Sequence, residues 1–392
     1  MAHDLRTLVP PGPVLLPVAI AALVEPLAWV VSLLPSTLDP GWYGRSSLLL
    51  AIHSLTVGVA ATAILGAGWQ LVPVITAQPW RPPAGAVTGV FLCGLPLLAV
   101  GLGAPGPVGT AGATLVILGL VARSALVVMA LVRAKGRLVT RAWLLGAELC
   151  LWAGLGVAAA LWAGRLGHPV FADPVAAVGR HVALLLGGWV GGSIVGFGSV
   201  LLPMFAVAAE PSAVLLGVAG CLWFGGALTG SPWVGAAGAL LVSIALGRTL
   251  LGGLRSKLAQ PLFALAGLAA TAALMPFAAG DVVVAAALTL FVLPMVRGLA
   301  QKIAPYLVWA RLSTHAPIPP PPRFGALQAW LSGAGAVVLV GGRLAGAPLS
   351  RAGVVLLLAG ALVHIAVLAV LAVRLSLIHM RQGALPGMEA TR

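Results

Sequence analysis

The chain has 392 residues, of which 60% are hydrophobic and only 8% are charged. A soluble domain carries roughly 25% charged residues because its surface must be wetted, so the composition excludes a water-soluble globular protein and predicts an integral membrane protein. The net charge of +14 lies mostly in short segments between apolar runs. This placement is typical of charges that set membrane orientation, so we expect the lipid bilayer as a partner and no nucleic acid.

Twelve apolar runs are long enough to cross the hydrocarbon core, which requires about 20 helical residues. In chain order they cover residues 12–34, 47–75, 85–103, 109–132, 142–164, 176–208, 212–229, 232–252, 259–279, 282–309, 325–346 and 352–376. Unpaired backbone groups are too costly in lipid, so each run is expected to be a helix. We therefore predict an all-α integral membrane protein with about twelve transmembrane helices, forming a single transmembrane domain over residues 1–392.

Basic residues are divided unevenly between the two sides that this helix order defines. Thirteen lie in the even-numbered loops and the terminal segments, against five in the odd-numbered loops, which are Arg45, Arg165, Arg180, Arg343 and Arg351. Lys and Arg are enriched in short cytoplasmic loops. We therefore expect both termini to be cytoplasmic.

A motif with glycine seven residues before proline recurs in every fourth predicted helix. It reads GAGWQLVP from Gly66, GFGSVLLP from Gly196 and GLAQKIAP from Gly298. Proline removes a backbone donor and kinks a helix, whereas glycine permits a close helix crossing. The recurrence predicts three pseudo-repeats of four helices, about 12–132, 142–252 and 259–376. The alternative is chance, because glycine and proline are abundant.

Histidines begin two of these three helices, near the expected outer surface. His53 lies 20 residues before Pro73, and His181 lies 22 residues before Pro203. Ionisable groups inside a span are costly and are functional candidates. His364, in the last predicted helix, is the other mid-span histidine. For each, the alternative is a buried imidazole bonded to a neighbouring carbonyl.

Glu25 and Glu148 are the only carboxylates well inside apolar runs. One interpretation is a proton relay. The other is pairing with a buried arginine, for which Arg123 and Arg248 are the candidates.

Three segments carry a resemblance to a known superfamily. They are HSLTVGVAATAILGAGWQLVPV from His53, HVALLLGGWVGGSIVGFGSVLLPMF from His181 and QKIAPYLVWARLS from Gln301. With twelve predicted helices in three groups of four, they resemble the heme-copper oxidase catalytic subunits, closest to the small nitric-oxide-reductase-like and nitrosative-stress-response-like bacterial members. The resemblance implies a protein of the prokaryotic inner membrane that binds heme.

The resemblance also implies roles for individual residues. Helix 2 of the superfamily supplies a heme ligand at the position of His53, and helix 6 supplies a copper ligand that corresponds to His181. Arginines between helices 11 and 12 pair with heme propionates, and Arg343 and Arg351 lie in or beside that loop here. We hypothesise that His53 and His181 together hold one heme b, with His364 as a possible replacement for either. No catalytic residue is assigned.

The sequence departs from the superfamily at its reaction centre. The oxidases need two histidines on helix 10 and a pair after helix 7, but the tenth predicted helix and residues 211–252 contain none. Two histidines alone are a poor copper site, so neither copper nor full oxidase or nitric oxide reductase activity is expected.

We therefore expect a metal-binding heme protein that acts in electron transfer, in diatomic-gas binding or as a membrane subunit of a redox complex. Its partners would be a redox protein or other membrane subunits. The alternatives are a polytopic transporter, because internal repeats are also typical of transporters, and a cofactor-free scaffold on the oxidase fold.

Overall fold

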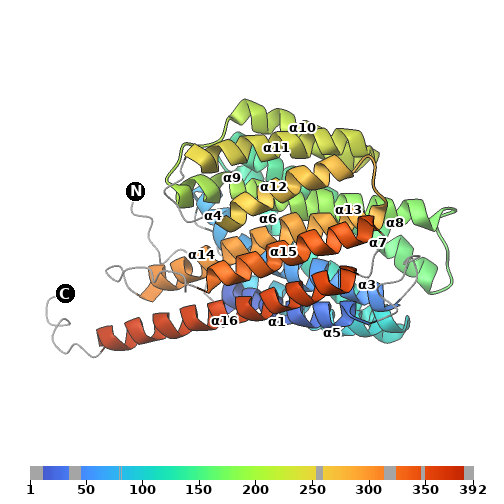
Figure 1. Ribbon diagram of the computed structural model, residues 1–392, viewed down its shortest axis with the longest axis horizontal. Coiled ribbons are helices and arrows are strands. Elements are labelled where there is room, and N and C mark those ends of the chain that lie inside the picture. The colour runs from blue at the N-terminus through green and yellow to red at the C-terminus, as the bar shows by residue number, and fades with distance from the viewer. Residues whose placement is uncertain are drawn as a thin grey trace.

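The protein is a bundle of helices lying side by side along the long axis of the molecule (Figure 1). The computed structural model describes residues 12–34, 46–78, 80, 82–252, 259–312, 324–345 and 349–383, and these ranges contain no β-strand. Ten helices within them are long and apolar enough to cross a membrane, and two shorter apolar helices accompany them. The predicted all-α membrane class is therefore confirmed.

The helices appear in the following order along the chain. They are α1 (Gly12–Ser32), α3 (Ser46–His53), η2 (Ser54–Ala61), α4 (Thr62–Thr76), α5 (Ala84–Gly103), α6 (Pro107–Arg133), α7 (Leu138–Arg165), α8 (Pro174–Val182), η3 (Ala183–Gly191), α9 (Gly192–Ala206), α10 (Ala213–Thr229), α11 (Pro232–Gly252), α12 (Ala259–Leu274), α13 (Gly280–Ala286), η4 (Ala287–Val292), α14 (Leu293–Leu312), α15 (Gly325–Leu344) and α16 (Leu349–Gly383).

Three long helices each contain a π-helical segment, labelled η. These composite helices are α3–η2–α4, α8–η3–α9 and α13–η4–α14, and in the described ranges no other helix contains such a segment. π-helical turns are rare and are frequently found at functional sites. Segment η2 contacts both η3 and η4. The three composite helices therefore meet along their π-helical parts, inside the bundle.

The glycine that opens each Gly–Pro motif lies in one of the composite helices and packs closely against the preceding helix. A Cβ atom added at Gly66 would lie 2.7 Å from the carbonyl oxygen of Val14 in α1. One at Gly196 would lie 2.7 Å from Leu144 of α7, and one at Gly298 would lie 3.1 Å from Gln260 of α12. Glycine allows these backbones to approach. The motif therefore marks close helix crossings, as predicted.

The prolines of the first two motifs mark the ends of their helices. Pro73 and Pro203 lie inside α4 and α9. Each is followed four residues later by a left-handed residue that ends the helix, Ala77 with φ 51° and Val207 with φ 53°. The same helix ending thus occurs twice, at corresponding places in two composite helices.

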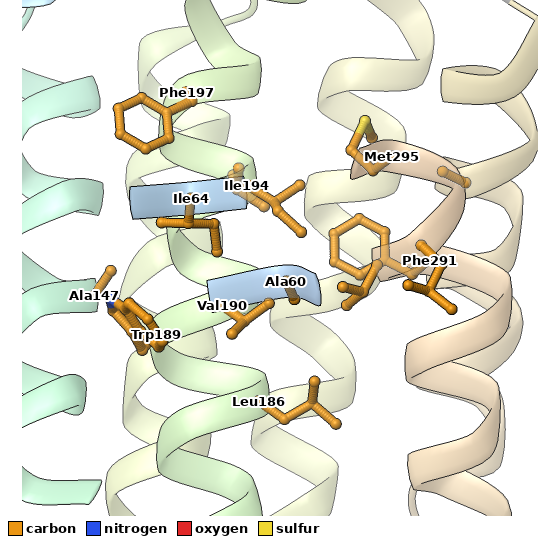
Figure 2. Close-up of a cluster of buried hydrophobic side chains, with 14 of the residues drawn as sticks. Ala60, Ile64, Ala147, Leu186, Trp189, Val190, Ile194, Phe197, Phe291 and Met295 are labelled. Atoms are coloured by element: carbon orange, nitrogen blue, oxygen red, sulfur yellow. The ribbon is translucent and has the colours of Figure 1, made fainter. Parts of the chain in front are cut away.

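An apolar cluster fills the region where the composite helices meet (Figure 2). Its labelled members are buried and come from all three composite helices and from α7; they are Ala60, Ile64, Ala147, Leu186, Trp189, Val190, Ile194, Phe197, Phe291 and Met295. Ile64, Ile194 and Phe197 also line a small cavity with mainly apolar walls, and apolar cavities stay dry. Any polar route across the bundle must therefore run beside this cluster.

Helix α1 illustrates how the outer helices face lipid. Its large exposed side chains, Leu16, Leu23, Leu27 and Val30, are 50–64% exposed and recur with helical spacing on one face. Glu25 is on the opposite face and is buried. An apolar exterior with a polar residue inside is the arrangement that a bilayer requires.

Packing contacts define two ends of the bundle. The starts of α12 and α15 adjoin through the contact between Gln260 and Gln328, and the start of α1 shares a cavity with Ile303 of α14. We call this the inner end and the opposite one the outer end, following the predicted orientation. The outer end holds the end of α1 and the starts of α3 and α13, which line a common cavity.

Candidate functional site

His53 and His181 come together toward the outer end of the bundle. Their ring centroids are 6.3 Å apart, and their planes differ by 22°. His53 is the last residue of α3, directly before η2, and His181 lies two residues before η3. The two composite helices thus place equivalent positions face to face, so that residues 128 apart in the chain form one pair.

Hydrogen bonding leaves ring nitrogens of this pair available. Nδ1 of His53 lies 2.8 Å from the carbonyl oxygen of Leu49. A carbonyl only accepts, so Nδ1 is the donor and Nε2 keeps its lone pair. Nδ1 of His181 is buried and has no hydrogen-bond partner among the described residues, although the backbone of Gly154 is close. A donor bond to a carbonyl is what orients metal-binding histidines.

Arg165 lies beside the histidine pair. It ends α7 and is close enough to His53 for the two groups to interact electrostatically. Its Nη2 donates to the carbonyl of Leu102 at 3.2 Å, whereas Nη1 is buried without a partner in the part of the chain that the structure describes. A buried, unsatisfied donor is costly. Arg165 is therefore suited to bind an anionic group next to the two imidazoles.

The spacing of the rings is compatible with one metal ion between them. An imidazole nitrogen binds such an ion at about 2.0–2.1 Å; with about 1.1 Å more to the ring centroid, two imidazoles bound end to end place their centroids about 6.3 Å apart. The lone pairs lie in the ring planes, so binding also requires both rings to turn Nε2 toward the ion, because the two rings are stacked here. Within the described ranges, no group of three or more His, Cys, Asp or Glu side chains is placed to hold a metal. Two ligands suit a heme, whose porphyrin supplies the other four nitrogens.

The other predicted site residues lie elsewhere. His364 is 4% exposed on α16, and its Nδ1 lies 3.3 Å from the amide nitrogen of Gln301. Arg343 pairs with Asp281 at 3.6 Å. Arg351 is exposed near the start of α16. Of the five residues predicted for a heme site, the structure brings together His53 and His181.

Two cavities between helices of the described ranges lie away from the histidine pair, which lines neither of them. The outer cavity, of about 80 Å³, lies between α1, α3, η2, α13, η4, α15 and α16 and includes Trp29, Asp281 and Arg343. The inner cavity, of about 60 Å³, lies between α1, α4, α9 and α14 and is lined mainly by apolar side chains. Arg343 therefore belongs to a different gap between helices from the one that holds His53 and His181.

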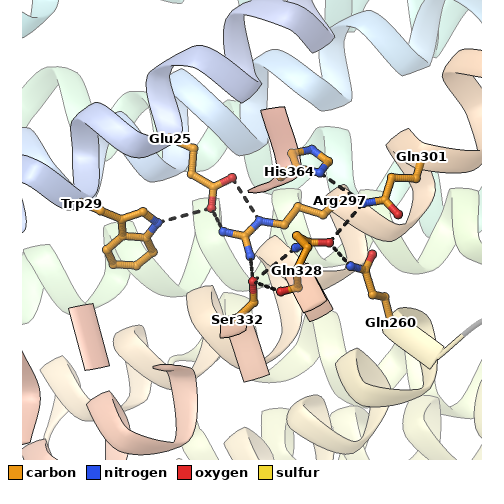
Figure 3. Close-up of polar contacts among 8 residues, drawn as sticks. All are labelled: Glu25, Trp29, Gln260, Arg297, Gln301, Gln328, Ser332 and His364. Carbon is orange, nitrogen blue, oxygen red and sulfur yellow. Dashed lines mark hydrogen bonds and ion pairs between the residues drawn. The ribbon is translucent and has the colours of Figure 1, made fainter. Parts of the chain in front are cut away.

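Glu25 forms a buried ion pair with Arg297 (Figure 3). Both residues are 1% exposed. Nε of Arg297 donates to Oε2 of Glu25 at 3.1 Å, and Nη2 donates to Oε1. The indole of Trp29 donates to the same Oε1 at 3.3 Å. The carboxylate is thus held by three donors from α14 and from its own helix.

The polar network continues from Arg297 toward the inner end (Figure 3). Nη1 of Arg297 donates to the hydroxyl of Ser332. That hydroxyl accepts from the amide of Gln328 at 3.2 Å. The side-chain oxygen Oε1 of Gln328 accepts from the side-chain amide of Gln301 at 3.1 Å and from that of Gln260. Five helices, α1, α12, α14, α15 and α16, therefore contribute to one hydrogen-bonded network inside the membrane region.

Glu148 forms the second buried ion pair, with Arg123, and both residues are 1% exposed. Pairing with a buried arginine was one of the two interpretations from sequence, and of the two candidate partners it is Arg123 that binds. Glu25 is also paired with a buried arginine, but its partner is Arg297 and neither of the two candidates named from sequence. The second pair is also less complete. Nε and Nη2 of Arg123 and Oε2 of Glu148 are buried without a hydrogen-bond partner among the described residues.

A repeated sequence signal accompanies the two carboxylates. Glu25 is followed by Trp29, and Glu148 by Trp152, each four residues later. The indole of Trp29 binds Glu25 itself, whereas that of Trp152 donates at 2.7 Å to Ser124, next to Arg123. The spacing Glu-x3-Trp thus accompanies both ion pairs, but its indole binds the carboxylate only at the first.

The two ion pairs take their arginines from different parts of the fold. At the Glu148 site Arg123 pairs with the carboxylate. At the Glu25 site the guanidinium comes from Arg297, directly before the glycine of the third Gly–Pro motif. Sequence reasoning missed Arg297 because the chain separates it from Glu25 by 272 residues.

No known protein-family model matches this chain, and no curated protein matches it. The fold and the site therefore define the class of this protein. It is an all-α membrane protein whose described residues include a histidine pair and two buried Glu–Arg pairs.

Proposed function

We propose that the protein binds one heme b in the membrane through His53 and His181, on a scaffold that resembles the heme-copper oxidase superfamily. The observation that carries the proposal is the nearly parallel pairing of two intramembrane imidazoles at 6.3 Å. The donor bond from His53 to Leu49 and the unsatisfied Nη1 of Arg165 support it, since a heme needs oriented imidazoles and partners for its carboxylates.

The function that this arrangement favours is electron transfer. Bound heme supplies a one-electron iron couple whose potential depends on its axial ligands. His53 and His181 would both hold the heme iron, and the bound group would then supply electron-transfer chemistry. Arg165 offers a positive charge beside the pair, near the outer end. The partner would be a redox protein or another membrane subunit.

The finer topology belongs to the same proposal. We propose twelve membrane spans in three groups of four, a single domain in a prokaryotic inner membrane with both termini cytoplasmic. The composite helices recur every fourth helix, and each motif glycine packs on the preceding helix. Both features support a pseudo-threefold repeat. The distribution of basic residues supports the orientation.

The test is an optical spectrum of detergent-purified protein, oxidised and dithionite-reduced, with a pyridine hemochrome assay. We expect one heme per chain and a sharp reduced α-band that is lost in His53→Ala and in His181→Ala. His364→Ala is the matched control, because it removes an intramembrane histidine outside the pair, and it should keep the band. Heme-free protein after expression with ample heme would contradict the proposal and favour a transporter or a cofactor-free scaffold.

A further inference from the structure

The outer cavity lies inside a ring of helices. Helix α1 contacts both α3 and α16, α16 contacts α15, and α15 contacts α13. The ring is closed by η4, which continues α13 and contacts η2, the continuation of α3. All of these elements line the cavity, whose volume is about 80 Å³. The ring therefore separates the cavity from the surrounding lipid and leaves the outer end of the bundle as its approach.

Two opposite charges stand at the outer rim of the cavity. Asp281 is the second residue of α13, and Arg343 is the last but one of α15. Their side chains are 29% and 17% exposed, and Nη1 of Arg343 lies 3.6 Å from Oδ2 of Asp281. Hydrogen bonds between such charged groups are about 2.7–2.9 Å long, so this contact is loose. Each group is therefore able to bind a ligand group of opposite charge.

The walls below the rim are apolar. Leu288 follows Asp281 by seven residues, which corresponds to about 10 Å along the helix. Leu339 lies one turn below Arg343. The buried wall side chains are Leu48, Ala51, Leu55, Leu288, Leu339 and Val354. Apolar cavities stay dry and bind apolar guests, and this one has room for roughly five water-sized groups. That space suits a branched aliphatic side chain.

We propose that the outer cavity binds an apolar α-amino acid of about the size of leucine, taken up from the outer side of the membrane. The ligand carboxylate binds Arg343, its ammonium group binds Asp281, and its side chain enters the apolar cavity. An aliphatic carboxylate or an aliphatic amine fits less well, because each satisfies one charge of the rim and meets a like charge in the other. His53 and His181 take no part, so the inference does not depend on heme.

The rim and the walls contribute to binding in different ways. Hydrogen bonds between charged groups are the stronger ones, and the loss of one is expected to weaken binding by about tenfold or more. Each methylene group that leaves water strengthens binding by about fourfold. Glycine, which has no side chain to bury, should therefore bind about a hundredfold more weakly than leucine.

The test is saturation binding of tritiated L-leucine to the detergent-purified full-length chain. We expect one saturable site per chain. Isocaproate, which lacks the ammonium group, and isopentylamine, which lacks the carboxylate, should each compete about tenfold more weakly than unlabelled leucine, and glycine more weakly still. The absence of saturable leucine binding at millimolar concentration would overturn the proposal. Isocaproate that competes as well as leucine would also overturn it, by showing a site for simple carboxylates.

Variants of the rim test the roles of the two charges. Arg343→Gln and Asp281→Asn should each weaken leucine binding by about tenfold or more. Both should fold, because a partly exposed ion pair contributes little to stability. Glu210→Gln is the matched control, since Glu210 forms an exposed pair with Arg137 at 3.3 Å and does not line the cavity. A folded Arg343→Gln protein that binds leucine like the control would contradict the proposal.

A variant of the wall tests where the side chain binds. Ala285 lines the cavity, so Ala285→Leu should fill it and abolish leucine binding while leaving the charged rim in place. A folded Ala285→Leu protein with normal binding would refute the proposal, and the glycine comparison tests the same point on the unaltered chain. His53→Ala should lose heme and keep leucine binding, so this proposal and the heme proposal can fail separately.

Discussion

The Glu25–Arg297 pair makes a quantitative prediction about stability. Arg297 places two donors on Glu25 and one on Ser332, and both charged residues are 1% exposed. Replacing only one partner leaves a buried charge without compensation, which costs about 3–5 kcal/mol. We therefore expect Glu25→Gln and Arg297→Gln each to lower the midpoint of thermal unfolding by about 6–10 °C, at roughly 2 °C per kcal/mol.

The double variant distinguishes the ion pair from simple loss of packing. Two glutamines at these positions can bond to each other and bury no charge, so Glu25→Gln/Arg297→Gln should recover most of the lost stability. The assay is thermal unfolding in detergent, followed by fluorescence-detected size exclusion, with the four proteins forming a double-mutant cycle. A double variant whose loss equals the sum of the two single losses would refute the reasoning.

The Arg123–Glu148 pair provides an internal comparison. Only one hydrogen bond joins its partners, whereas two join Glu25 and Arg297. The coupling measured by the cycle Glu148→Gln/Arg123→Gln should therefore be smaller. An equal or larger coupling would show that the number of hydrogen bonds does not control the strength of these buried pairs.

Two further predictions concern packing. A Cβ atom at Gly226 would lie 2.3 Å from the backbone nitrogen of Gly235, whereas nothing lies within 4 Å of one at Gly217; Gly226→Ala should therefore lower the yield of monodisperse protein and Gly217→Ala should not. Equal yields would contradict the close α10–α11 crossing. Cys150 is 0% exposed, so in a variant that retains only this cysteine, a thiol-reactive dye should respond only at the unfolding temperature. Rapid labelling of folded protein would show that the site is open.

Individual helices and ion pairs show which features of the fold could be predicted from the sequence alone. The apolar runs predicted helices at 12–34 and 109–132, and α1 and α6 occupy those places, because lipid leaves the backbone no other stable conformation. The Glu148–Arg123 pair was also within reach, since α6 and α7 follow each other closely in the chain. The Glu25–Arg297 pair was not, because hydropathy does not report which distant helices become neighbours.

For the histidine site, too, the sequence determined some features and the tertiary structure determined others. Sequence by itself determined that His53 and His181 lie inside apolar helices at corresponding distances before a proline, and that the chain must be a helical membrane protein. Only the tertiary structure decided that these two rings face each other while His364 and Arg343 lie in other gaps. The physical reason is that side-chain direction depends on helix rotation and packing, and here on three π-helical segments, none of which is determined by hydropathy.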